Sequence, residues 1–230
     1  MMTTTTKVRR GFDEIAPVYE IACKHDSYIA GGYAAYMATP QVNWQPGDID
    51  IFPPTDKALY GMIAEYQKMG YDDFSESLNA CTLEYSDWGE LSEDDIRWKA
   101  IQLVKPLVGD DCIPEGLIKR FDLTVCCAVL VSPDCVMVHD DLINDTINRR
   151  LRFNHINNPL AAAMRLLKYS RKGGVASASV VANLFEMYAD APVEKRQGLL
   201  NLMLNNGITT EQFDDEEAGY REDWYDDDSA

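Results

Sequence analysis

Two aspartates separated by one residue, Asp48 and Asp50, stand in the short apolar segment GDIDIF. Side chains two residues apart in a β-strand share a face, so the two carboxylates would lie together while Ile49 and Ile51 enter the core. Neighbouring carboxylates repel each other unless a cation lies between them, and their oxygens suit Mg²⁺, which also accepts substrate phosphate oxygens. An edge strand with a solvated acidic face is the alternative, but the apolar flanks disfavour it. The segment therefore predicts a magnesium site on a buried strand.

A glycine pair, Gly31 and Gly32, lies upstream, between the short apolar run at residues 28–30 and the helical pattern YAAYMA. Glycines at such a turn let the backbone approach a phosphate closely, and the N-terminus of the following helix favours an anion. Gly31 and Gly32 are therefore predicted to cradle phosphates.

Taken together, AGGYAAYM and GDIDIF resemble the signature of the nucleotidyltransferase fold superfamily, which includes DNA polymerase beta, poly(A) polymerases and CCA-adding enzymes. That signature combines a Gly-Gly or Gly-Ser turn, a short helix, a D-x-D strand and a third carboxylate on a later strand. The Arg-Asp pair that follows the glycines in CCA-adding enzymes is absent here, which disfavours a CCA-adding function. The segment FDLTVC also resembles superfamily members from large viruses and phages.

The resemblance implies a metal site with three carboxylates. Asp48 and Asp50 would bridge two Mg²⁺ ions, and Asp122, at the head of the apolar segment DLTVCCAVLV, would be the third catalytic carboxylate. Glu84, in the segment CTLEY, is the second choice for that position. Metal bound at Asp122 would lower the pKa of the attacking hydroxyl.

A basic helix is predicted over residues 159–172, which follow a cap asparagine, begin with proline and end before a glycine pair. Arg165, Lys168 and Lys172 recur on one side of it at helical spacing. The helix resembles the one that supplies a lysine to the nucleotide triphosphate in this superfamily. The resemblance assigns that role to Lys168, assisted by Arg165 or Arg171, because cations stabilise charge on a transferring phosphoryl group. The alternative is an amphipathic surface helix with a solvated basic face.

Charge is unevenly distributed along the chain, whose net charge is −17. Residues 211–230 hold ten acids and one arginine, whereas residues 146–185 contain no acid. The overall charge excludes broad, nonspecific coating of nucleic acid, while the basic segment predicts a local anion site. The acidic end is predicted to be a mobile tail that screens the basic segment from nonspecific nucleic acid, docks a partner or only adds solubility.

The predicted fold is of the α/β (α+β) class, a small mixed β-sheet with flanking helices followed by a helical part. Its predicted parts are a flexible N-terminus (1–12), a nucleotidyltransferase catalytic domain (13–145), a helical C-terminal region (146–210) and the acidic tail (211–230). The six cysteines lack ligand spacing, and the chain has neither an apolar signal segment nor a membrane-length apolar run. These features predict a cytoplasmic protein with reduced thiols.

The expected activity is Mg²⁺-dependent transfer of NMP from an NTP, taken to be ATP, to a hydroxyl acceptor with release of pyrophosphate. The acceptor stays open among tRNA or another RNA end, a protein hydroxyl and a small molecule. The alternative is a catalytically inactive binding or scaffold protein on the same fold, of viral origin, that docks partners through its acidic tail.

Overall fold

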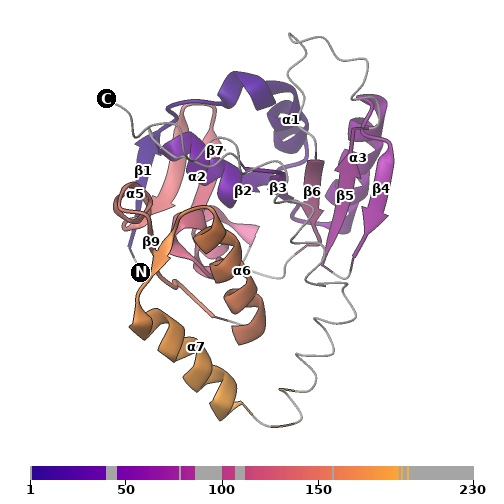
Figure 1. Cartoon of the computed structure of the whole chain (residues 1–230). Coiled ribbons are helices and arrows are strands. Elements are labelled where there is room, and N and C mark those ends of the chain that lie inside the picture. The colour runs from indigo at the N-terminus through magenta and orange to yellow at the C-terminus, as the bar shows by residue number, and fades with distance from the viewer. Residues whose placement is uncertain are drawn as a thin grey trace, which may run out of the picture.

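The computed structural model describes residues 2–39, 46–77, 79–85, 100–106, 112–156, 158–191, 193 and 196. Within these residues, one eight-stranded mixed sheet forms the centre of the molecule (Figure 1). Its strands, in spatial order, are β1 (Thr3–Lys7), β8 (Cys135–His139), β7 (Ala128–Ser132), β2 (Tyr28–Ala30), β3 (Ile49–Phe52), β6 (Ala100–Val104), β5 (Ala80–Glu84) and β4 (Asp73–Glu76). Neighbouring strands run antiparallel except β3 and β6, which are parallel.

Three helices pack on one face of this sheet: α1 (Phe12–Lys24), α2 (Gly32–Ala38) and α3 (Asp56–Lys68). Ile49 and Ile51 of β3 are fully buried in the core that these helices share with the sheet. The helix α3 begins at Thr55, whose side chain accepts a hydrogen bond from the Ala58 N–H, as an N-cap residue does. The alternation along β3 therefore directs its other side chains, those of Asp50 and Phe52, to the opposite face.

The opposite face carries α4 (Pro114–Arg120), which packs against Ala30, Cys127 and Val129. The chain then continues through α5 (Leu142–Ile147), α6 (Pro159–Arg171) and α7 (Ala178–Asp190). A separate apolar cluster joins α6 and α7 to Leu123, Val125 and Leu151. Asn158 caps α6 by accepting hydrogen bonds from the N–H groups of its first turn, as the sequence predicts.

The predicted α/β class is confirmed, with a sheet larger than expected and helices after it. The flexible N-terminus predicted for residues 1–12 is wrong, because Thr3–Lys7 forms β1 and Phe12 begins α1. Four consecutive threonines favour extended backbone, and β1 is the edge strand that pairs with β8 from Thr3↔His139 to Lys7↔Cys135. The sequence also missed β4 and the two-residue pair of β9 (Arg150–Leu151) with β10 (Val175–Ala176).

The strand predicted over DLTVCCAVLV begins later than expected, at Ala128, because Thr124–Cys126 forms the short 3₁₀ helix η2. Hydrogen bonds from Thr124 divert this segment from the sheet: its N–H donates to the Arg152 carbonyl and its hydroxyl to the buried Asp145 carboxylate. The predicted helix near residues 193–207 lies mostly, and the acidic tail wholly, outside the described residues. No helix in the described part combines the length and apolar character that a membrane crossing requires.

Candidate active site

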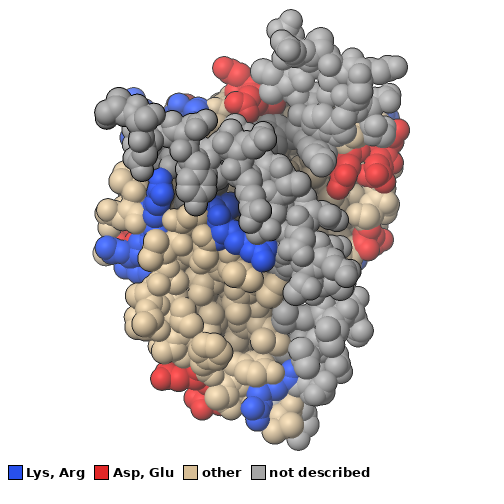
Figure 2. Space-filling view, viewed as in Figure 1, with Lys and Arg blue, Asp and Glu red and all other residues tan. Residues whose placement is uncertain are grey.

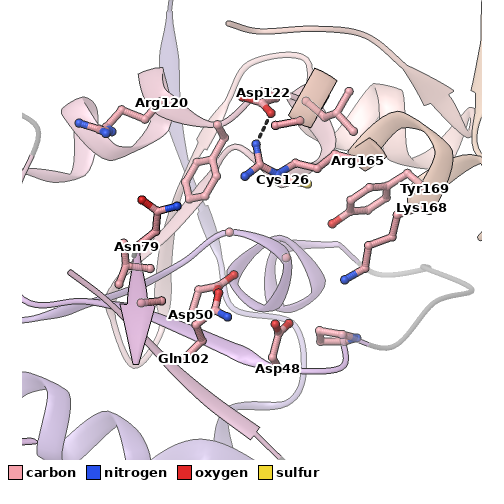
Figure 3. Close-up of a pocket in the computed structure, with 18 of the residues that line it drawn as sticks. Asp48, Asp50, Asn79, Gln102, Arg120, Asp122, Cys126, Arg165, Lys168 and Tyr169 are labelled. Carbon is pink, nitrogen blue, oxygen red and sulfur yellow. Dashed lines mark hydrogen bonds and ion pairs between the residues drawn. The ribbon is translucent and has the colours of Figure 1, made fainter. Parts of the chain in front are cut away.

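A cavity of about 620 Å³ opens between the face of β3 and β6 and the helix α6 (Figure 3). It collects most of the site residues that the sequence predicts, although they come from segments far apart in the chain. The predicted residues that line it are Gly31, Gly32, Asp48, Asp50, Asp122, Arg165 and Lys168. Arg171 and Glu84 do not line it; both are exposed, Arg171 on α6 and Glu84 at the end of β5.

Asp48 and Asp50 form the carboxylate floor of the cavity. Asp50 lies in β3 and Asp48 directly precedes it, and both carboxylates point toward α6 (Figure 3). Burial, followed by repulsion from Asp48, raises the pKa of Asp50 to about 7, against the opposing effect of Lys168 and Arg165. Two acids in this state fit a divalent cation, because a cation between them would remove the repulsion.

The lack of a side chain at Gly31 leaves space for the Asp50 carboxylate. Its φ of 80° and ψ of −142° fall in a region that side chains rarely adopt. A Cβ atom there would lie 3.0 Å from Asp50 Oδ2 and 3.3 Å from Phe121 Cε1. The Gly31 N–H donates to the Ala128 carbonyl at 2.9 Å, so this amide is used within the fold, and the cradling of phosphates by Gly31 and Gly32 stays a prediction. Gly31 thus serves as the spacer that admits the Asp50 carboxylate.

Arg165, Lys168 and Lys172 form the cationic wall of the cavity, on α6 and at its C-terminal cap. Their helical spacing brings them onto one side, and Figure 3 shows Lys168 reaching toward Asp48. On the face seen in Figure 2, Lys and Arg side chains gather over the upper end of α6, while Asp and Glu lie at the margins. Floor and wall together can hold a metal-bound polyphosphate between them.

Asp122 lines the same cavity as the floor and pairs with a cation of the wall. Its carboxylate, 5% exposed, forms an ion pair with the Arg165 guanidinium, whose side chain is 58% exposed. The Asn154 N–H donates to the Asp122 carbonyl at 2.7 Å, which fixes the backbone of this loop. Within the described residues, no three His, Cys, Asp or Glu side chains gather closely enough to hold a metal ion. Asp122 therefore lines the same cavity as the floor but pairs with Arg165, and its sharing of a metal with the floor stays a prediction.

Gln102, which sequence reasoning missed, takes the position beside the floor. It pairs with Asp50 across the parallel strands β3 and β6 and lines the cavity. The signal was present in the sequence, because Gln102 is the one polar residue in the strand segment AIQLV. Other lining residues that the prediction missed are Asn79, Arg120, Cys126 and Tyr169. Burial raises the pKa of the Cys126 thiol to about 11, so it stays protonated at neutral pH.

The donor set fits Mg²⁺ held by two protein carboxylates. Asp48 and Asp50 offer the hard oxygen ligands that this ion prefers, and Mg²⁺ commonly takes one or two carboxylates and completes its shell with phosphates and water. The raised pKa of Asp50 marks the uncompensated charge that the ion would neutralise. The structure therefore fits a metal on the floor without a contribution from Asp122.

Solved structures of a tRNA-processing enzyme, a CCA-adding enzyme and a tRNA nucleotidyltransferase share this fold. A tRNA-processing enzyme in its apo form matches with a TM-score of 0.54 and 16% identity over 87% of this chain and 54% of its own. The Thermotoga maritima CCA-adding enzyme complexed with tRNA matches with a TM-score of 0.53 and 14% identity over 82% and 47%. A tRNA nucleotidyltransferase with a primer tRNA and an ATP analogue matches with a TM-score of 0.51 and 14% identity over 81% and 56%.

This chain spans about half the length of the solved structures it matches. The likeness shows that the chain has the fold of these enzymes, which is the fold that the glycine pair and the D-x-D strand predict. None of the curated proteins matches the chain. A family model described as Gabija anti-defense 2 family protein (Gad2) matches residues 4–149, well over half of the chain. The chain therefore belongs to the Gabija anti-defense 2 family and carries a nucleotidyltransferase fold.

Proposed function

We propose that this protein transfers NMP from an NTP to a hydroxyl acceptor, with Mg²⁺ bound at Asp48 and Asp50. The observation that carries the proposal is the carboxylate floor facing the cationic wall across one cavity. In the transfer, the acceptor hydroxyl would give its proton to solvent and its oxygen would form a bond to the α-phosphorus, while the bond from that phosphorus to the oxygen that bridges it to the β-phosphate breaks. The products are the NMP-modified acceptor and pyrophosphate.

Each side chain has a separate part in this proposal. Asp48 and Asp50 would hold one or two Mg²⁺ ions, which supply charge neutralisation at the reacting phosphate. Lys168, Lys172 and Arg165 would hold the β- and γ-phosphates and stabilise the charge that develops on the leaving pyrophosphate. Asp122 is a positioning residue, because its buried carboxylate fixes the direction of the exposed Arg165 guanidinium.

Family membership supplies the biological setting of the proposal. The chain belongs to a family described by its action against the Gabija defence, so we place the transfer in a phage-infected bacterial cytoplasm. ATP is the first candidate donor. RNA ends are candidate acceptors because solved structures with this fold include complexes with tRNA, and a protein or small-molecule hydroxyl is the other option.

The proposal is tested by incubating the protein with each α-labelled NTP and Mg²⁺ in extracts of bacteria with and without the Gabija system. We expect one extract molecule to acquire the α-label, and to acquire no label when the same NTP carries it on the γ-phosphate. The Asp48→Asn/Asp50→Asn double variant is the control and should label nothing. Labelling by the double variant, or no α-label from any NTP, would contradict the proposal.

A second candidate function, nucleotide binding without catalysis, is favoured by one observation. The strand position beside Asp50 is occupied by the neutral Gln102, and Asp122, a third acid in the cavity lining, is paired with Arg165. Such a protein would bind Mg²⁺ and NTP and act by docking partners, with the acidic residues 211–230 as the docking segment. Tight Mg²⁺-dependent NTP binding, combined with no label transfer in any extract, would favour this function.

A further inference from the structure

The cavity has a second half that the phosphate chemistry does not use. Asp50 and Phe52 of β3 share one face with Asp48, which directly precedes the strand, so the lining changes from carboxylate to aromatic along the strand. The neighbouring strands continue this change with Val104 of β6 and Ala80 of β5, which pair with each other.

Two phenyl rings and polar planar groups surround this half. The rings of Phe52 and Phe121 meet edge to face, with centroids 5.9 Å apart and an interplanar angle of 84°. The Phe121 backbone is fixed, because its carbonyl accepts a hydrogen bond from Asn154 Nδ2 at 3.1 Å. Figure 3 shows Asn79 and Arg120 on the side of Asp50 away from Lys168. Phe52, Phe121, Asn79 and Arg120 are here called the aromatic half.

The carboxylate floor lies at the junction of the two halves. The position of a Cβ atom on Gly31 would be within 3.3 Å of both Asp50 Oδ2 and Phe121 Cε1, so the Phe121 ring lies next to the Asp50 carboxylate. Lys168 and Arg165, on the other side, are close enough to lower the pKa of Asp50. An α-phosphate at the floor would therefore have cations on one side and the aromatic half on the other.

We infer that the aromatic half is a nucleobase site. This inference rests on the proposed function, which places the α-phosphate on the floor and the β- and γ-phosphates on the wall. The ribose and base of the NTP then extend from the α-phosphate toward Phe121. An acceptor nucleotide would enter from that same side, because the attacking and leaving oxygens lie roughly in line on the phosphorus.

The side chains of the aromatic half suit a nucleobase, whether it belongs to the NTP or to the acceptor. A phenyl ring offers a stacking surface worth about 1–3 kcal/mol per base. The Asn79 and Gln102 amides offer donors and acceptors to a base edge, and Arg120 offers a planar cation. The cavity volume, about 620 Å³, falls within the range of about 300–1,000 Å³ for small-molecule sites.

The test compares binding of the four NTPs with binding of inorganic tripolyphosphate, all with Mg²⁺. Phe121→Leu should lower the affinity for the tightest-binding NTP by about 5- to 150-fold, which is the range that base stacking implies. The same change should alter the affinity for tripolyphosphate by less than twofold. Phe74→Leu is the matched control, because Phe74 is exposed on β4 and does not line the cavity. Asn79→Ala, at an exposed position, should change the ratio of affinities among the four NTPs.

A second arm separates the two sources of the base. If Phe121→Leu leaves NTP affinity unchanged but weakens AMP binding to protein saturated with a non-hydrolysable NTP analogue, the base belongs to the acceptor. Equal loss of NTP and tripolyphosphate affinity, or no loss for any nucleotide, would overturn the inference. That failure is distinct from failure of the proposed function, in which Asp50→Asn would leave Mg²⁺-dependent NTP binding intact.

Discussion

The carboxylate floor and the cationic wall face each other across one cavity, but the fold holds them in different ways. The floor lies on β3, between β2 and β6, and is fixed by the fully buried Ile49 and Ile51. The wall lies on α6, which buries only Pro159, Ala162 and Leu166, and its Arg165 and Lys168 are exposed.

The residues that match the family model include the floor and exclude the wall. It spans residues 4–149, which include the floor, and ends before α6. Exposed cations on a helix with one anchored face can adjust to a bound polyphosphate, whereas acids on a central strand cannot move without the sheet. The floor therefore defines the position of the chemistry, and the wall adapts to the ligand.

The largest expected effect is at the floor. Asp48→Asn or Asp50→Asn should lower the rate of NMP transfer by about a thousandfold or more, since each removes a charge that holds the metal. The measurement is the initial rate of α-label transfer at saturating NTP and Mg²⁺. Each variant should melt, without metal, at the same temperature as the wild type or higher, because carboxylate repulsion is relieved. Full activity in both single variants would contradict the role of the floor.

The wall should contribute less, and mainly to binding. Lys168→Ala should weaken Mg²⁺–NTP affinity by about 10- to 150-fold, the range for a lost hydrogen bond to a charged group. Arg171→Ala removes the same charge from the same helix, but Arg171 does not line the cavity, so its affinity should change less than twofold. Titration calorimetry measures both. Equal losses in the two variants would show that α6 acts through its overall charge, and that no defined wall exists.

Variants of Asp122 test whether this residue positions Arg165 of the wall or binds metal together with the floor. If it positions Arg165, Asp122→Asn should weaken NTP binding by no more than Arg165→Ala does, and the double variant should be no weaker than Arg165→Ala alone. Mg²⁺ affinity without nucleotide should stay unchanged. A tenfold loss of Mg²⁺ affinity in Asp122→Asn would instead return Asp122 to the floor as a metal ligand.

The smallest expected effect is a dependence of stability on pH. The pKa of Asp50 is raised from its ordinary value of 3.8 to about 7 in the folded protein. The folded state therefore binds the proton more tightly, and this stabilisation, complete below pH 4, is lost as the pH rises through about 7. Without metal, the melting temperature of the wild type should fall relative to Asp50→Asn between pH 5 and 8. If the melting temperatures of the two proteins changed with pH in parallel, the pKa of Asp50 would not be raised in the folded protein.

The floor was predictable from the sequence, and the wall was predictable only in part. Alternation of Asp48, Ile49, Asp50 and Ile51 depends on local geometry, and the structure reproduces it. The helical spacing of Arg165, Lys168 and Lys172 predicted their common side of α6, and all three line the cavity, whereas Arg171, which the resemblance offered beside Arg165, does not.

The position of Asp122 could not be predicted from its own segment. The apolar run after it reads as a continuous strand, yet Thr124 turns toward Asp145 and Arg152, which lie more than twenty residues later in the chain. Gln102 was missed for a related reason, because strand pairing set by the whole sheet places it beside Asp50. Local patterns therefore located the elements, and long-range hydrogen bonds decided which side chains meet.

The most direct test of the central claim is the dependence of NTP binding on Mg²⁺, measured by titration calorimetry for each of the four NTPs in Mg²⁺ and in EDTA. In the wild type, Mg²⁺ should increase the affinity for the tightest-binding NTP by at least about tenfold, because the metal would link the carboxylates of the floor to the phosphates. In Asp48→Asn, Mg²⁺ should give no such gain. NTP binding that is independent of Mg²⁺ in the wild type, or an equal Mg²⁺ gain in Asp48→Asn, would contradict a metal site on the carboxylate floor.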